Sequence, residues 1–351
     1  VKYQVDPLNK QFELKLFIQN YFKAGSAKLS DYYNANPITL DANCVENWVN
    51  EHSKTNLVVK DLQKLLVNGW EQVQINKLSV HSKVEQTTKL DAMSRWMTEV
   101  TSRTIVAAPY AISALFSSVF IEAKKLLKDM LHESVNYSDG MTHAQLNALI
   151  NDTEFEVVVE DDLSKQDRQT THDIIDIEME IYRFLGVHDD ILALYKWCHH
   201  NWKWKAPGVN GMWDAMRLTG QVTTSIGNAI TNLIVHNRFY ARNKDKISLT
   251  CIVGDDVVFL CTKKLDVLMH GTETKVLYNM VSKISQKQYV GNYLSMLVFN
   301  IGGIKGVCPH FKSLRHRFSV ANYTMLDTDL EEKTKNRILS YCHTLRPLPQ
   351  V

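Results

Sequence analysis

The spacing of hydrophobic residues changes several times along the chain, and each change marks a different element. From residue 14 to about residue 133, apolar positions recur mostly at helical spacing, with polar stretches between them. Residues 155–160 form a short β-branched run that predicts a strand, and the polar residues 162–167 end it. Isoleucine and leucine then recur at helical spacing over residues 174–185, and Gly186 is suited to terminate a helix. The pattern therefore predicts a strand, a loop and a helix, in that order.

A second helix is expected over about residues 222–240. Its apolar positions form one stripe, whereas Thr224 and Asn228, four residues apart, lie on the other side. The helix would therefore present this polar pair away from the core.

Two apolar, β-like runs follow, at residues 247–253 and 257–261. The tripeptide Gly254-Asp255-Asp256 joins them, and both residue types suit a tight turn, so we expect a β-hairpin with two carboxylates at its tip. Alone, the tripeptide is a weak indication of function, because an ordinary type I′ turn also explains it.

Residues 104–121 carry no charge and reach the length at which a membrane span becomes possible. Pro109, Tyr110 and three serines dilute this stretch, so a buried strand and helix are favoured over a membrane span. The chain begins at Val1 without a basic and then apolar signal segment, so we expect it to be either trimmed or cut from a longer protein, and a polyprotein fragment would explain that start.

Composition narrows the class of protein only slightly. The chain has 351 residues, of which 45% are hydrophobic and 22% charged, as in an ordinary soluble protein with a substantial core. Lysine and arginine number 40 against 38 aspartate and glutamate residues, so the formal net charge is +2 and any basic surface must be local. The 6 cysteines contain no CxxC pair, which indicates free thiols and a reducing compartment.

The carboxylates that follow the strands are candidates for metal binding. Transfer of a nucleotide to a 3′-hydroxyl uses two divalent ions about 3.5–4 Å apart, and Mg²⁺ prefers carboxylate oxygens. One aspartate at the end of a strand and one or two at the tip of an adjacent hairpin suffice if the strands lie in one sheet. Asp162 and the pair Asp255-Asp256 occupy such positions.

Three segments, taken in their order along the chain, strengthen this hypothesis. They are Asp162-Leu-Ser-Lys-Gln-Asp167, Thr219-Gly220-Gln-Val-Thr-Thr224-Ser-Ile-Gly-Asn228 and Gly254-Asp255-Asp256. Together they resemble the A, B and C motifs of viral RNA-dependent RNA polymerases of the alphavirus-like supergroup, with the closterovirus-like or endornavirus-like branch as the nearer guess. The resemblance covers about residues 77–320 and is strongest over residues 155–261.

The resemblance implies roles for the carboxylates. Asp162 and Asp255 would bind the two metal ions, and Asp256 would assist. Asp167 and Asn228 would engage the ribose 2′-hydroxyl of the incoming nucleotide, the group that distinguishes RNA from DNA.

Further nucleotide contacts are implied in the same way. Thr219 stands where the family often has serine beside Gly220, which keeps a hydroxyl but adds a methyl group, and Thr224 belongs to the same nucleotide-binding segment. Upstream, Lys83 and Arg103 lie where the family places cations over the triphosphate channel, although cations on a solvated face would have the same pattern.

Two downstream segments resemble motifs D and E. In Asn279-Met-Val-Ser-Lys283, the lysine would act as a catalytic acid that protonates the departing pyrophosphate, and a solvated surface lysine is an equal alternative. Gln288-Tyr-Val-Gly-Asn-Tyr293 resembles the motif E hairpin, in which Tyr289 and Tyr293 would grip the nascent RNA, with ordinary core aromatics as the slightly favoured alternative.

The resemblance implies a right-hand polymerase of the α/β (α+β) class. We expect mostly helical fingers over residues 1–150, with a basic nucleotide-channel segment at residues 77–103. A palm with an antiparallel, RRM-like sheet would cover residues 151–300, with a fingers insertion near residues 186–213. Residues 301–351 would form a partial thumb.

The implied cofactor is Mg²⁺ or Mn²⁺. The implied partners are template RNA, nascent RNA, nucleoside triphosphates and the other domains of a viral replicase polyprotein. The expected location is the host cytoplasm, in membrane-associated replication complexes, with no transmembrane span in the chain itself.

Two other functions fit the residues less well. A reverse transcriptase would carry a bulky residue in place of Asp167 and an aromatic-X-Asp-Asp sequence at Gly254-Asp255-Asp256. A non-catalytic RNA-binding protein on a polymerase-derived fold would normally have lost one of the metal carboxylates, and all are present.

Three features are given structural interpretations. Cys198-His199-His200 lacks a second ligand pair at the spacing of a zinc site. The tryptophans near residue 200 are expected in the core rather than stacked on bases. Asp189-Asp190 is expected to cap a helix that starts at Ile191.

Overall fold

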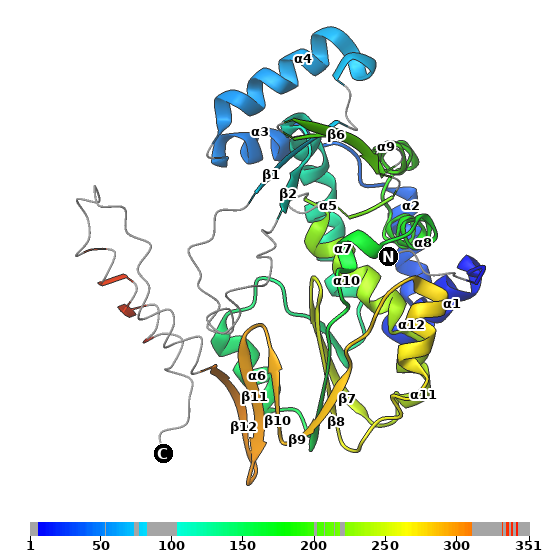
Figure 1. The fold of residues 1–351 in the computed structure, drawn as a ribbon, viewed down its shortest axis with the longest axis vertical. Coiled ribbons are helices and arrows are strands. Elements are labelled where there is room, and N and C mark those ends of the chain that lie inside the picture. Colours follow the sequence, from blue (N-terminus) through cyan, green and yellow to red (C-terminus); the bar gives the residue numbers. More distant parts are fainter. Residues whose placement is uncertain are drawn as a thin grey trace. The chain divides into compact units, whose positions relative to one another are not determined.

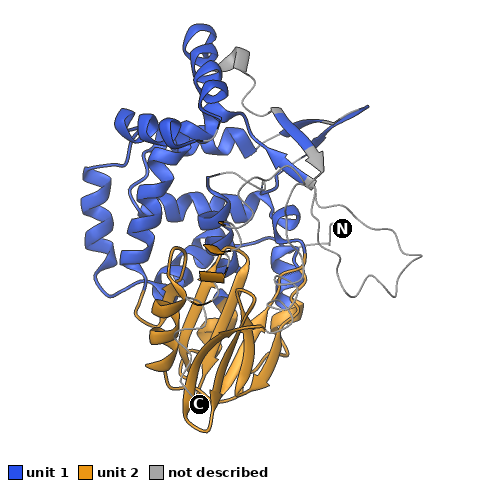
Figure 2. Ribbon diagram, turned by 90° about the vertical axis from the view of Figure 1, so that its left-hand side faces the viewer, with its two compact units in different colours: residues 1–131, 165–237, 273–280 blue, residues 132–164, 238–272, 281–351 orange. Residues whose placement is uncertain are grey.

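The computed structural model describes residues 6–52, 54–73, 77–82, 104–199, 202–206, 208–213, 215–217 and 222–310, with isolated positions beyond residue 331. The chain forms two compact units, and each is assembled from three separate stretches of sequence (Figure 2). Unit 1 comprises residues 1–131, 165–237 and 273–280, and unit 2 comprises residues 132–164, 238–272 and 281–351.

Unit 1 is largely helical (Figure 1). Its helices are α1 (Lys10–Tyr21), α2 (Ser26–Ala35), α3 (Ala42–Glu51), α4 (Thr55–Val73), α5 (Tyr110–Met130), α7 (Gln166–Gln169), α8 (His172–Phe184), α9 (Asp189–His199) and α10 (Thr224–Val235). The helical character expected before residue 133 is therefore confirmed. The uncharged stretch 104–121 is a strand followed by a helix, as predicted. Of the helices that the structure describes, none has both the length and the apolarity needed to cross a membrane.

Unit 1 also contains a small sheet whose strands are far apart in sequence. Its strands are β1 (Lys77–Ser82), β2 (Thr104–Ala107), β5 (Trp202–Ala206) and β6 (Val209–Trp213), in the order β2-β1-β5-β6. The rings of Trp204 and Trp213 stack across β5 and β6 with centroids 5.1 Å apart, and Trp202 is fully buried. The expected core position is confirmed for Trp202, whereas Trp197 is 44% exposed.

Helix α8 follows the predicted pattern closely. Thr171 caps its N-terminus by accepting a hydrogen bond from the Ile174 backbone N–H, and Gly186 follows its end with φ 87. Asp189 and Asp190 lie within the first turn of α9 rather than before it, so α9 begins two residues earlier than expected. Both carboxylates still face the positive end of a helix dipole.

The helix expected over residues 222–240 is two helices, α10 and α11 (Asn237–Asn243), with His236 between them. The break lies beside buried polar side chains. Asn237 Nδ2 donates a hydrogen bond to the backbone oxygen of Glu13, and the fully buried Glu13 carboxylate also accepts from Tyr278 Oη at 2.9 Å. Tertiary hydrogen bonds, which periodicity does not report, therefore fix this corner of unit 1.

Unit 2 is built on a five-stranded sheet. Its strands are β3 (Val135–Tyr137), β4 (Val157–Asp161), β7 (Ile247–Val253), β8 (Asp256–Cys261) and β9 (Ser285–Gln288), in the order β3-β7-β8-β4-β9. β3 runs parallel to β7, and the other pairs are antiparallel. In the order β7-β8-β4-β9, the strand that comes first in the sequence, β4, lies between the third, β8, and the fourth, β9, as in split βαβ sheets.

A second, three-stranded sheet and one helix complete unit 2. The sheet consists of β10 (Val290–Tyr293), β11 (Met296–Ile301) and β12 (Ile304–Pro309), and the helix is α6 (His143–Asn151). Both contribute to one apolar core with the large sheet, which contains Val158 and Val258 together with residues such as Ile150, Tyr293 and Val298. Helix α12 (His270–Tyr278), like α11, contains residues of both units.

Candidate active site

The metal-binding candidates follow one another at one end of the large sheet of unit 2. β4 and β8 pair in antiparallel register up to Asp161 and Val257, so Asp162 continues beyond β4 toward Asp256, the first residue of β8. β8 also pairs with β7, and Asp255 lies in the turn that joins them (Figure 1). The strands predicted to carry the carboxylates are therefore neighbours in one sheet.

Gly254 determines the shape of the hairpin tip. Its φ is 58, and Asp255 is not among the described residues with positive φ. Positive φ at the first central position alone is the pattern of a type II′ turn, so the type I′ turn considered from the sequence is wrong, although the hairpin is confirmed. A Cβ at Gly254 would meet nothing within 4 Å, so backbone conformation rather than space favours glycine here.

The three carboxylates interact electrostatically. The pKa of Asp256 is raised from 3.8 to about 6. Burial by surrounding protein atoms is the largest cause, although part of the side chain remains exposed, and the negative charges of Asp255 and Asp162 add to it. Such a cluster favours either a shared proton or a bound cation.

Lys283 lies beside this cluster. Its ammonium group is 2.7 Å from Asp162 Oδ2, and its backbone N–H donates to the Asp162 carbonyl at 3.1 Å. The side chains are 58% and 70% exposed, respectively, so the pair remains accessible to solvent. The predicted motif D lysine is thus next to a predicted metal ligand while it also remains solvated.

Asp161 was not identified from the sequence. Side chains alternate along a strand, so Asp161 faces away from Asp162, and it is buried. Its Oδ2 accepts a hydrogen bond from Ser282 Oγ at 2.7 Å and lies 3.0 Å from His270 Nε2. The sequence did contain a signal: Asp161 is a carboxylate on the same face of the strand as Val157 and Val159, where an apolar residue would be expected. These contacts hold the end of β4, and hence the backbone of Asp162.

Asp167 and Asn228 meet in unit 1. Asn228 Nδ2 donates to Asp167 Oδ1 at 2.7 Å, and the side chain of Gln166 holds the helix backbone by donating to the Asn228 carbonyl at 2.9 Å. Asn228 is buried, and its Oδ1 has no hydrogen-bond partner among the described residues. The pair predicted from motifs A and B is therefore in direct contact, and it keeps a buried acceptor available.

Residues 6–295 match the family described as RNA dependent RNA polymerase. The chain belongs to this family. The matched residues include the three carboxylates Asp162, Asp255 and Asp256. They also include Asp167 and Asn228, which are in contact.

Several viral replicase proteins are similar to this polymerase. It is 30% identical to the non-structural polyprotein pORF1 of an avian hepatitis E virus over 160 residues, which are 45% of this chain and 10% of that protein. It is 26% identical to the replicase large subunit of Turnip vein-clearing virus over 193 residues, 53% of this chain and 12% of that protein. The RNA replication protein of Potato virus S is 25% identical over 180 residues, 51% of this chain and 48% of that protein.

These matches place the polymerase in the alphavirus-like supergroup. The closterovirus-like or endornavirus-like branch stays a prediction. The chain spans between about a tenth and about half of the length of these relatives.

The remaining predicted nucleotide contacts are only partly visible in the polymerase. Thr224 is the half-buried first residue of α10. Thr219, Gly220, Lys83 and Arg103 lie outside the described residues. Their roles stay predictions.

The two tyrosines of the motif E segment differ in exposure. Tyr289 is 45% exposed and has φ 64, an uncommon backbone conformation for a bulky residue. Tyr293 is 3% exposed and belongs to the core of unit 2. The RNA-gripping role predicted for Tyr293 does not agree with this position, because its ring is covered by other side chains, whereas Tyr289 presents a surface that could stack on a base.

Proposed function

We propose that this polymerase extends an RNA strand on an RNA template by transferring nucleotides from nucleoside triphosphates to a 3′-hydroxyl. The observation that carries the proposal is the cluster of Asp162, Asp255 and Asp256 at one end of the unit 2 sheet, in a chain of the RNA dependent RNA polymerase family.

Asp162 and Asp255 would hold two divalent ions, Mg²⁺ or Mn²⁺, with help from Asp256. The donor set fits such ions, because it consists of carboxylate oxygens; burial and, after it, the negative charges of Asp255 and Asp162 raise the pKa of Asp256. Divalent ions bound here would favour deprotonation of the attacking hydroxyl and neutralise charge on the triphosphate. Asp161, held by Ser282 and His270, would keep the end of β4 in place for Asp162.

Lys283 would act on the leaving group. Its ammonium group lies beside Asp162 and is more than half exposed, so an anionic ligand could reach it. Negative charge increases on the pyrophosphate as the bond to it breaks. A lysine ammonium can donate a proton to that oxygen, which is general acid catalysis.

Asp167 and Asn228 would select ribose. The acceptor Asn228 Oδ1 could receive the hydrogen of the 2′-hydroxyl, while its Nδ2 remains bonded to Asp167. A deoxyribose would leave this buried acceptor without a partner, and that cost is the basis of discrimination.

In the right-hand architecture that we propose, the palm is the β7-β8-β4-β9 sheet and the fingers come from the helical unit 1. Residues 304–309, within the expected thumb, form β12 and pair with β11. They would therefore extend the palm. The expected thumb after residue 310 lies almost wholly outside the described residues.

The test is nucleotide incorporation on a primed RNA with Mg²⁺ or Mn²⁺. Asp162→Ala and Asp255→Ala should each abolish incorporation while the circular dichroism spectrum stays unchanged, because each removes a metal ligand rather than core packing. Asp190→Ala is the matched control, since this carboxylate is 91% exposed. Activity of both variants within about tenfold of wild type, roughly 1.4 kcal/mol of barrier, would show that the assignment is wrong.

A further inference from the structure

A fully buried ion pair lies behind the Asp167–Asn228 contact in unit 1. Glu178 on α8 and Arg217 are both 0% exposed. Arg217 Nη2 is paired with Glu178 Oε2, and Nη1 donates to Glu178 Oε1 at 3.0 Å, so the guanidinium engages both carboxylate oxygens. Glu178 interrupts the apolar stripe of α8 between Ile174 and Ile181, which was the signal available in the sequence.

Hydroxyl groups complete the network. Arg217 Nη1 donates to Tyr195 Oη at 2.7 Å, and Nη2 lies 3.3 Å from Thr231 Oγ1 on α10. Glu178 Oε1 also accepts from Tyr182 Oη at 2.7 Å. Hydrogen bonds between these hydroxyls and the two charged groups reduce the cost of burying the charges and fix the orientation of the guanidinium.

Arg217 contacts both segments that carry the ribose pair. Its backbone N–H donates to the Asp167 carbonyl at 2.9 Å. Its guanidinium lies against α10 at Gly227, the residue before Asn228, where a Cβ would be 2.5 Å from Arg217 Cζ and 2.6 Å from Glu178 Oε1. Arg217 therefore links two segments: its backbone bonds to that of Asp167, and its side chain packs against the helix turn that presents Asn228.

Stability alone is a weak reason for this arrangement. Replacing a buried ion pair by apolar residues of similar volume is often neutral or stabilising. Glycine inside a helix costs about 1 kcal/mol relative to alanine, yet Gly227 is the position at which the guanidinium needs space. The guanidinium of Arg217 is rigid, carries five donors and contacts both α8 and α10, so it can instead fix the positions of these two helices.

We propose that Arg217, oriented by Glu178, is a positioning residue that sets the geometry of Asp167 and Asn228 and so determines selection of ribonucleotides. The proposal rests on the ribose role proposed above for that pair. Arg217 would act through this pair, by its backbone bond to Asp167 and its contact with α10 at Gly227.

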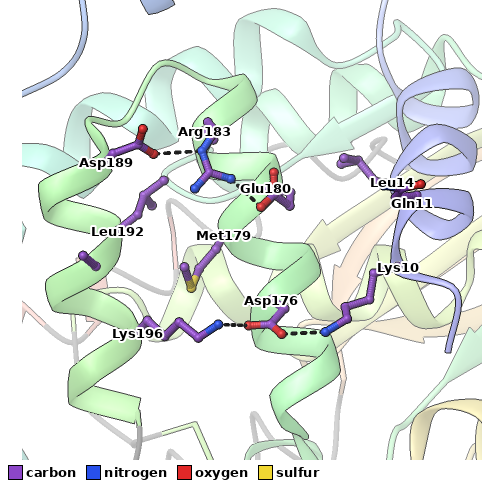
Figure 3. A pocket seen from close by; sticks show the side chains of 11 residues that line it. Lys10, Gln11, Leu14, Asp176, Met179, Glu180, Arg183, Asp189, Leu192 and Lys196 are labelled. Atoms are coloured by element: carbon purple, nitrogen blue, oxygen red, sulfur yellow. Dashed lines mark hydrogen bonds and ion pairs between the residues drawn. The ribbon is translucent and has the colours of Figure 1, made fainter. Parts of the chain in front are cut away.

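The test compares ATP with 2′-deoxyATP in two ways, by incorporation kinetics and by titration calorimetry with the 351-residue chain. Arg217→Lys keeps the charge but loses the fork, and Gly227→Ala displaces the fork without changing any charge. Each should lower the ribose preference about tenfold and raise the KM for ATP by a similar factor, with kcat changed less than about threefold. Arg183→Lys, in the exposed pair with Glu180 on the same helix (Figure 3), is the matched control and should change none of these quantities.

The double variant Arg217→Met/Glu178→Leu separates positioning from folding, because no buried charge remains unpaired. We expect it to fold and to bind both nucleotides with a reduced ribose preference. A double variant with the ribose preference and KM of wild type would overturn the proposal. So would Arg217→Lys and Gly227→Ala variants that melt at a lower temperature but discriminate normally.

Asp167→Ala and Asn228→Ala distinguish this proposal from the one on which it rests. Unchanged discrimination in these variants would refute the ribose pair, and the positioning role with it. Lost discrimination there, together with normal discrimination in Arg217→Lys, would refute the positioning role alone.

Discussion

The raised pKa of Asp256 makes both stability and metal affinity depend on pH. In the folded state the carboxyl of Asp256 has a pKa of about 6, above the ordinary value of 3.8. Protonation of Asp256 therefore contributes fully to the free energy of unfolding below about pH 4, and this contribution is lost as the pH rises through about 6. Asp256→Asn should remove this decline. The measurement is the melting temperature of both proteins from pH 4 to pH 7.5 in the presence of a chelator.

The informative quantity is the difference between the two curves, since other groups titrate in both proteins. Identical slopes between pH 4 and pH 7 would contradict the clustering of the three carboxylates. Protons should also compete with Mn²⁺, so the metal affinity of wild type should fall as the pH drops below about 6.

Asn228 should affect sugar selection more than turnover. Asn228→Ala removes both the bond to Asp167 and the buried acceptor Oδ1, so we expect the preference for ATP over 2′-deoxyATP to fall at least about tenfold, with a smaller change in kcat. Single-nucleotide incorporation with each triphosphate measures this. Asn36→Ala, at an exposed helix end of unit 1, is the control. A variant at Asn228 that still discriminates as wild type does would count against the ribose role.

Some functional candidates could be predicted from the sequence, and others could not. Asp162, Asp167 and Asn228 were identified because motif order and spacing specify them. Glu178 and Arg217 are 39 residues apart, and a pairing between such distant positions leaves no mark in local periodicity. Only the interrupted apolar stripe of α8 signalled one of the two partners.

At the scale of elements, β10 packs tightly against β4 in unit 2. A Cβ at Gly291 would lie 2.8 Å from Val158 Cβ and 3.2 Å from Glu160 Oε1. Glu160 Oε1 also accepts hydrogen bonds from Lys287 Nζ at 2.7 Å and from the Asn292 backbone N–H at 2.9 Å. β10 is therefore held against β4 by both shape and charge.

Gly291→Ala should consequently destabilise the protein by about 1–3 kcal/mol, the usual cost of overpacking a core. Gly271→Ala is the control, because a Cβ there meets nothing within 4 Å and the residue lies in α12. Urea denaturation measures both variants. Equal midpoints for Gly291→Ala and wild type would show that β10 can move away from β4 without cost.

The elements best predicted from the sequence are those with strong periodicity and clear end signals, such as α8, β7 and β8. Motif E was expected to form a hairpin over residues 288–293, whereas the hairpin in the structure joins β10 to β11. Its turn consists of Leu294 and Ser295, both with positive φ (50 and 61), which these residue types seldom adopt. Leu294 packs against the core of unit 2, a tertiary contact that local propensity does not report.

At the scale of the whole molecule, a divalent ion that binds only the folded chain should stabilise it. The gain is about 2.7 kcal/mol at a hundredfold excess over Kd. Mn²⁺ or Mg²⁺ should therefore raise the melting temperature, and a nucleoside triphosphate should raise it further because its phosphates complete the coordination of the ions. Asp255→Asn should blunt both effects, as measured by differential scanning fluorimetry.

The same variant has a second expected effect. Asp255→Asn removes one of the repelling charges while keeping its shape, so without added metal it should melt slightly above wild type. A variant that melts lower and still responds fully to Mn²⁺ would identify Asp255 as a structural turn residue, and the two-metal proposal would lose its main support.

The division into two units could not be predicted from the sequence. A domain boundary is normally marked in the sequence by a linker rich in glycine, proline or polar residues. Here each unit is assembled from three separate stretches of sequence, and no such linker marks the points where the chain passes from one unit to the other. Even motif A is divided, with Asp162 in unit 2 and Asp167 in unit 1. Within motif A the chain passes from unit 2 to unit 1 between Ser164 and Lys165. Lys165, which has a positive φ (55), is the N-cap of the short helix α7.

The buried carboxylate of Glu13 has a consequence for synthesis on the ribosome. Its partner Tyr278 follows 265 residues later in the chain. At a translation rate of about 5–20 residues per second, roughly 13–53 seconds pass between the synthesis of the two residues. During that interval α1 can neither bury this charge with its native partner nor complete its packing in unit 1. We therefore expect the nascent N-terminal helices to depend on chaperones until residue 280 has emerged from the exit tunnel.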